Sequence, residues 1–195
     1  MTCICSYRTH TQLLVVADRR IIAEDELVSD QYVKYTLLAG NRLLVAIAGE
    51  LGPAHVWLRA ARRAKAKTID ELMSDFVPGE HVSLVYDRHT HELYVADGAG
   101  SLLQPAGDVV AIGSGAAFVR GYLAASEPLG GLDGQACVAT AERLLVQALQ
   151  ASSKQHLSIS PDCDVLLLTR EPARAPRTSA SRRRSASQRA DRRAA

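Results

Sequence analysis

The chain has no long apolar segment and no paired cysteine spacing. None of its apolar runs approaches the roughly 18 residues that span a bilayer, and its start lacks the charged region and cleavage site of a signal peptide. These absences argue against a membrane or exported protein, and we expect a cytoplasmic location. The four cysteines, Cys3, Cys5, Cys137 and Cys163, have no CxxC spacing, which indicates neither a zinc site nor a disulfide framework. We expect them to be reduced and buried, and we expect no metal or cofactor.

Residues 1–170 and residues 171–195 differ in composition. With 47% hydrophobic residues in a chain of 195, the first part can bury a substantial core, so we expect one folded domain there. The second part has no aromatic or large aliphatic side chain, and eight arginines against Glu171 and Asp191 give it a charge of +6, which leaves −4 for residues 1–170 within the net +2. We predict a disordered basic tail. Such a tail can contact nucleic acid weakly or an acidic protein surface, or be a solvated extension without a role.

A threonine directly follows the initiator methionine. Methionine is normally trimmed before so small a residue, so we expect Thr2 to become the mature N-terminus. Its hydroxyl would then be a nucleophile and its own α-amino group the base. A free α-amino group has a pKa of about 7.7 to 8.0, so part of it can accept a proton near neutral pH. Most chains that begin Met-Thr have no catalytic N-terminus, so Thr2 by itself decides nothing.

Two charged residues follow Thr2 at equal spacing. Asp18 comes sixteen residues after Thr2 and Lys34 sixteen after Asp18. Lysine is scarce in this chain, which otherwise uses arginine, so a lysine in an apolar stretch suggests a need for a compact ammonium there. Burying that ammonium requires a partner such as Asp18, and an ammonium near the Thr2 amine disfavours protonation of the amine. The alternative is that Lys34 lies on a wet strand face and Asp18 in a solvated turn.

The hydrophobic pattern predicts pairs of strands alternating with pairs of helices. Pro53 suits a first helical turn, Thr68 and Glu71 suit a capping box, and residues 39–41 suit a hairpin turn. The predicted strands are 3–6, 13–17, 32–38, 42–48, 81–86, 92–95, 108–112 and 164–168, and the predicted helices are 54–61 after Pro53, 68–76, 116–126 and 135–151, the last two joined by 128–131. This order by itself predicts an α+β fold.

The same residues resemble a known catalytic centre. Thr2, Asp18 and Lys34, together with the later segment 111–115, resemble the proteasome β-subunit and HslV peptidase family of N-terminal nucleophile hydrolases. The likeness runs from residue 2 to about residue 168. It implies a four-layer αββα sandwich of two antiparallel sheets flanked by helices. It also implies Thr2 as the nucleophile, Asp18 as the carboxylate that orients Lys34, and Ser114 as a helper beside the N-terminus.

The resemblance extends to the substrate side of the site, with some departures. It implies the backbone N–H of Gly49 as the donor to the oxyanion. After the acidic residue the family typically has a small residue and then threonine, whereas this chain has Ile21 and Ile22, which puts the usual substrate groove in doubt. Asp162 is one match to a later acidic element of the family. Ile21 and Ile47 suggest an apolar pocket and cleavage after apolar residues. These departures favour a divergent bacterial member, such as the betaproteobacterial homologue, over a standard HslV subunit.

The resemblance implies a threonine-type endopeptidase that assembles as homo-oligomeric stacked rings. Its substrate would be a peptide or an unfolded protein, its rings would have six or seven members, and any ATPase or other regulator is unidentified. Two alternatives remain open. The chain could form rings with weak or no peptidase activity, or it could be a non-peptide amidase of the same superfamily. A nucleic-acid-binding module is disfavoured because only the tail is basic.

Overall fold

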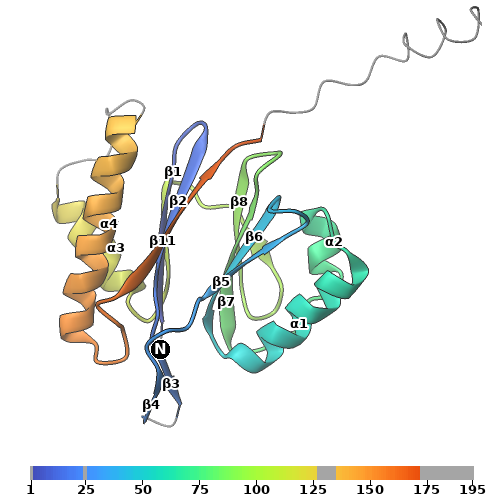
Figure 1. Cartoon of the computed structure of the whole chain (residues 1–195), viewed down its shortest axis with the longest axis horizontal. Coiled ribbons are helices and arrows are strands. Elements are labelled where there is room, and N and C mark those ends of the chain that lie inside the picture. Colours follow the sequence, from blue (N-terminus) through green and yellow to red (C-terminus); the bar gives the residue numbers. More distant parts are fainter. Residues whose placement is uncertain (1, 24–25, 127–134, 172–195) are drawn as a thin grey trace, which may run out of the picture.

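The computed structural model describes residues 2–23, 26–126 and 135–171 (Figure 1). Two antiparallel sheets lie face to face, and a short two-stranded ribbon extends from one end. The first sheet has the order β10-β1-β2-β11, the second has the order β5-β6-β7-β8-β9, and β3 pairs with β4. The strands are β1 (Cys3–Arg8), β2 (Gln12–Asp18), β3 (Ile21–Ala23), β4 (Glu26–Ser29), β5 (Tyr35–Leu38), β6 (Leu43–Gly49), β7 (His81–Asp87), β8 (Glu92–Ala96), β9 (Leu102–Leu103), β10 (Val109–Gly113) and β11 (Cys163–Thr169), and the helices are α1 (Leu51–Ala64), α2 (Ile69–Met73), α3 (Ala116–Ala125) and α4 (Gln135–Gln155).

Helices cover the outer face of each sheet. In Figure 1, α3 and α4 lie on one side of the sheet that holds β1 and β2, while α1 and α2 lie on the far side of the sheet that holds β6 and β7. Three buried clusters match these layers: one between α3/α4 and the first sheet, one between the sheets, and one between the second sheet and α1/α2. The sequence therefore folds as the predicted αββα sandwich.

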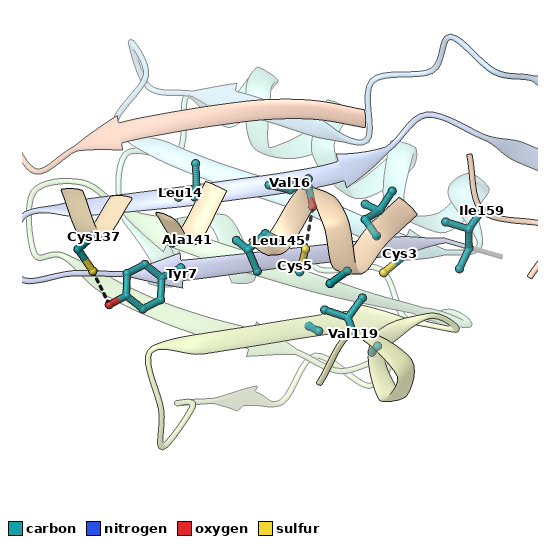
Figure 2. Close-up of a cluster of buried hydrophobic side chains, with 14 residues drawn as sticks. Cys3, Cys5, Tyr7, Leu14, Val16, Val119, Cys137, Ala141, Leu145 and Ile159 are labelled. Carbon is teal, nitrogen blue, oxygen red and sulfur yellow. Dashed lines mark hydrogen bonds between the residues drawn. The ribbon is translucent and has the colours of Figure 1, made fainter. Parts of the chain in front are cut away.

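Strand β1 shows how the sequence builds two cores at once. Cys3, Cys5 and Tyr7 pack under the helices, whereas Ile4 packs between the sheets, because alternate residues of a strand face opposite ways. Figure 2 shows the helix side of this arrangement, where the Cys5 thiol donates to the carbonyl of Val16 at 3.6 Å and the Tyr7 hydroxyl lies 3.0 Å from the sulfur of Cys137. All four cysteines are free thiols; Cys3, Cys5 and Cys137 are buried as predicted, whereas Cys163 is only partly buried.

Strand β6 does the same for the second sheet. Leu44 and Ala46 face the first sheet, and Val45 and Ile47 face α1. Trp57 of α1 anchors this outer core, since it is fully buried and donates its ring N–H to the carbonyl of Leu72 at 2.7 Å. Burying both faces of β6 explains its unbroken apolar sequence.

Most predicted elements appear with shifted ends. The first hairpin and the turn at residues 39–41 are confirmed, and Thr68 caps α2 by accepting from the N–H of Glu71 at 3.2 Å. The strand predicted over 32–38 begins only at Tyr35, and the helix predicted to reach residue 76 ends at Met73. Strands β3, β4 and β9 were not predicted. The predicted linker 128–131 lies outside the described residues.

The C-terminal end of the described chain is held in place. The backbone N–H of Glu171, the first residue of the predicted tail, donates to the carbonyl of Arg88 at 3.0 Å, and its carboxylate lies 2.8 Å from the ring of His89. The remainder of the predicted tail, 172–195, lies outside the described residues. No helix within the described ranges has the length and apolar character to cross a bilayer.

Candidate active site

Thr2 lies at the entrance to a central strand. It directly precedes β1, and the next residue, Cys3, pairs with Gly113 of β10. Gly113 has φ +89°, and a Cβ atom there would fall 2.1 Å from the carbonyl oxygen of Thr2, so only glycine permits this approach. The Ser114 hydroxyl donates to the same oxygen at 3.4 Å. The turn between β10 and α3 therefore holds the backbone of Thr2 in place. Ser114 lies beside the N-terminus, as predicted.

Asp18 is fully buried at the end of β2 and is surrounded by donors. One carboxylate oxygen accepts from the backbone N–H of Cys3 at 2.8 Å. The other accepts from the backbone N–H of Arg20 at 3.1 Å and of Ser160 at 3.4 Å. These three N–H groups come from β1, from the turn after β2 and from the loop before β11. A buried carboxylate with this number of donors is held in one orientation.

Lys34 joins Asp18 to the Thr2 hydroxyl. Its ammonium donates to the Asp18 carboxylate at 2.8 Å and to Oγ1 of Thr2 at 3.0 Å. Lys34 is only 3% exposed, and its carbonyl accepts from the N–H of Ile47, which fixes it beside β6. Burial lowers the pKa of the Lys34 ammonium below its usual value, although the adjacent Asp18 carboxylate opposes that shift. The predicted buried ion pair is therefore present, and the alternative of a wet strand and a solvated turn is wrong.

A cavity of about 380 Å³ opens beside Thr2. Gly49 lies on its wall at the end of β6 with φ +106°, and a Cβ atom there would fall 2.3 Å from the carbonyl oxygen of Glu80. The next residue, Glu50, donates its N–H to that same carbonyl at 2.8 Å. The backbone around Gly49 is thus fixed against the start of β7. The cavity is lined by Thr2, Ala48, Gly49, Gly79, Glu80, His81, Val82, Gly98, Gly113 and Ser114.

The structure places the other predicted site residues at the margins of this centre. Ile21 and Ile22 are half-buried on the ribbon strand β3. Ile47 is buried beneath α1 and lines a second cavity, of about 20 Å³, together with Lys34. Asp162 is exposed, and its backbone N–H donates to the hydroxyl of Ser160 at 3.2 Å. The structure thus brings Asp162 near the loop that reaches Asp18 and not into hydrogen-bond contact with Thr2.

Several participants could not be anticipated from side-chain chemistry. The donors from Cys3, Arg20 and Ser160 are backbone groups, and Gly113 contributes by having no side chain. The family resemblance includes the segment 111–115, but the contact of Gly113 with Thr2 depends on strand pairing across the whole domain. Within the described ranges no group of three His, Cys, Asp or Glu side chains is placed to hold a metal ion.

Comparisons with known proteins give a structural likeness. No protein-family model and no curated protein sequence matches the chain. Among solved structures it is similar to eukaryotic HslV from Trypanosoma brucei, with 18% identity, a TM-score of 0.64 and coverage of 86% of this chain and 99% of that one. It is also similar to BPH from Thiobacillus denitrificans, with 15% identity, a TM-score of 0.61 and coverage of 87% and 98%. The structure of the same BPH in complex with epoxomicin has 15% identity to this chain and a TM-score of 0.62, and the match covers 87% of this chain and 100% of that one. The chain thus has the fold of HslV and of the bacterial proteasome homologue.

Proposed function

We propose that the chain is a threonine peptidase subunit whose nucleophile is Oγ1 of Thr2. The observation that carries this proposal is the buried Lys34 ammonium, which contacts both the Thr2 hydroxyl and the Asp18 carboxylate. Thr2 in turn lines the cavity of about 380 Å³. An ammonium in a poorly hydrated site stabilises a developing alkoxide strongly, and Asp18 keeps it in position.

The proposed reaction begins with cleavage of the bond that precedes Thr2. The freed α-amino group accepts the hydroxyl proton, and Oγ1 attacks the carbonyl carbon of a peptide bond bound in the cavity. The backbone N–H of Gly49 stabilises the oxyanion, and the amine returns its proton to the leaving amine. Water, deprotonated by the same amine, then attacks the acyl-enzyme ester and releases Thr2. Lys34 keeps its proton throughout and disfavours protonation of the resting amine.

The substrate class and assembly follow from the resemblance of the site and fold. We infer that the substrate is an unfolded polypeptide and that the subunit works within stacked homo-oligomeric rings. Ile47, which shares a small cavity with Lys34, and Ile21 are the proposed contacts for an apolar side chain of the substrate. The epoxomicin complex of the Thiobacillus protein supplies a suitable probe for the site.

The test is the intact mass of the untagged protein before and after exposure to a β-lactone and, separately, to epoxomicin. We expect loss of the residue before Thr2 and one adduct per chain with each reagent. The variant Thr2→Ala should form no adduct, whereas Thr169→Ala, which removes an exposed hydroxyl on β11, should react like the wild type. Lys34→Met should slow adduct formation by at least about 100-fold, and Lys154→Met should not.

Substrate assays then separate the remaining alternatives. Degradation of an unfolded protein by an assembled ring supports the peptidase. Hydrolysis of a small amide without any peptide cleavage would replace it with an amidase. A retained residue before Thr2, or no adduct with either reagent, would overturn the catalytic proposal and leave a ring-forming protein without this activity.

A further inference from the structure

The last two turns of α1 and the residues that follow them carry a concentration of positive charge. Five cations lie within nine residues, and no acidic residue occurs from residue 51 to residue 69. All five side chains are exposed, and none of them forms an ion pair within the described ranges. Because residues 1–170 carry −4 in total, the rest of that region carries −9. The five cations, which we call the α1 basic cluster, are Arg59, Arg62, Arg63, Lys65 and Lys67.

Helix stability accounts for only part of this cluster. Arg62 and Arg63 lie in the last turn of α1, where cations offset the negative end of the helix dipole. Lys65 and Lys67 follow the helix, and Arg59 lies a turn earlier. Like charges at this density repel one another in the folded state, so the cluster costs free energy that the helix dipole does not return.

An apolar cleft of about 490 Å³ opens directly beside this cluster. It lies between the end of α1 and the β5–β6 hairpin, where α1 terminates at Lys65 in a left-handed conformation. The small side chains of Ala61 and Ala66 leave the space open. The cleft is lined by Leu37, Leu38, Ala39, Arg42, Ala61, Arg62, Lys65, Ala66, Lys67 and His89.

The basic side chains around the cleft fall into two groups. Arg42 is neutralised by Asp87 at 2.7 Å, and His89 lies 2.8 Å from Glu171. Arg62, Lys65 and Lys67 form no such pair within the described ranges, so their charge faces outward. The cleft thus combines an apolar floor with three outward-facing cations, and it shares no lining residue with the cavity beside Thr2.

We propose that this cleft binds an acidic peptide segment of a partner protein that carries a large apolar side chain. The apolar side chain enters the cleft, and flanking carboxylates pair with Arg62, Lys65 and Lys67. The volume matches pockets that enclose a small ligand or one anchoring side chain. Charge complementarity excludes the chain's own segment 172–195, whose arginines outnumber its single acid. Single-stranded nucleic acid is disfavoured because alkyl groups, not stacking aromatic rings, form the floor.

Fluorescence anisotropy with the full-length protein tests the proposal. The probe is a fluorescein-labelled peptide of alternating glutamate and leucine, and its controls replace leucine by serine or glutamate by lysine. We expect saturable binding of the first peptide only. Raising the salt from about 0.1 M to 1 M shortens the Debye length from about 10 Å to 3 Å and should weaken binding markedly.

A matched pair of charge-reversal variants locates the site. Arg62→Glu with Lys65→Glu should weaken binding by at least about tenfold. Arg143→Glu with Lys154→Glu on α4 makes the same change in net charge, also reverses a cation in the last turn of a helix, and should leave binding unchanged. Four results would each overturn the proposal. They are an equal loss of peptide affinity in both variants, equal binding of the serine peptide, tighter binding of an oligothymidine, and no binding of the glutamate–leucine peptide.

Discussion

Replacing Asp18 by asparagine should destabilise the protein more than removing its lysine partner. The Asp18 carboxylate receives Lys34 and the N–H of Cys3 on one oxygen, and the N–H groups of Arg20 and Ser160 on the other. An asparagine amide has one acceptor oxygen, so in either orientation its NH₂ group faces donors. The variant therefore combines an unpaired buried ammonium with unsatisfied backbone N–H groups.

The expected loss in the free energy of unfolding at pH 7 is about 3–5 kcal/mol, the range for breaking a buried ion pair on one side. Lys34→Met leaves the Asp18 carboxylate with its three backbone donors and should cost less, about 1–3 kcal/mol, the range for a lost charge-assisted hydrogen bond. Urea unfolding at a fixed protein concentration measures both values. Lys154→Met on the exposed surface of α4 is the control and should change stability by less than about 0.5 kcal/mol.

The pH dependence distinguishes this explanation from simple misfolding. Asp18 is the main group that opposes the effect of burial, so without it the pKa of folded Lys34 falls further below the value of 10.5 expected in the unfolded chain. Between those two pKa values the unfolded state binds more protons than the folded state, so stability rises with pH. The gap between Asp18→Asn and the wild type should therefore shrink as the pH rises from 7 toward 10. A loss below about 1 kcal/mol, or a gap independent of pH, would refute the reasoning.

Two further predictions concern the wall of the Thr2 cavity. Gly49→Ala should lower the free energy of unfolding by about 1–3 kcal/mol, because φ +106° and the Glu80 carbonyl oppose a Cβ atom. The control Gly52→Ala places its Cβ atom in open space and should not destabilise the protein. Thermal unfolding compares the two variants, and equal melting temperatures would contradict the proposed backbone strain. Burial lowers the pKa of His81 below 6.5, so the unfolded chain takes up a proton first and stability falls as the pH drops below 6.5. His81→Leu should lose less stability between pH 7.5 and 5 in urea titrations, and a steeper loss in the variant would refute the assignment.

The sequence predicts the fold well where hydrophobic periodicity is long. Strands β1, β2 and β7 and helix α4 are all at least six residues long, and each buries at least one continuous face. The unpredicted strands β3, β4 and β9 have three, four and two residues, too few for a period to emerge. Their pairing depends on tertiary context.

The candidate site divides along a similar line. Thr2, Asp18, Lys34 and Ser114 were predicted from the family resemblance that their type and order carry, and the structure brings them together. Asp162 lies exposed, and the neighbouring backbone of Ser160 reaches Asp18 instead. Any residue except proline offers a backbone N–H, so residue identity says nothing about which one points into a site. Only the packing of the loop before β11 decides it.

The contacts of Asp18 join segments that are synthesised far apart in time. Cys3 and Ser160 both reach the same carboxylate, and the Ser160 contact with Asp18 spans 142 positions of sequence. Thr2 leaves the ribosome well before the segment around Ser160, which completes the surroundings of Asp18. Chains are made at roughly 5–20 residues per second, so the proposed nucleophile spends several seconds or more without its assembled environment. The proposed nucleophile therefore gains its complete hydrogen-bonded surroundings only after the segment before β11 has been made and has packed against β2.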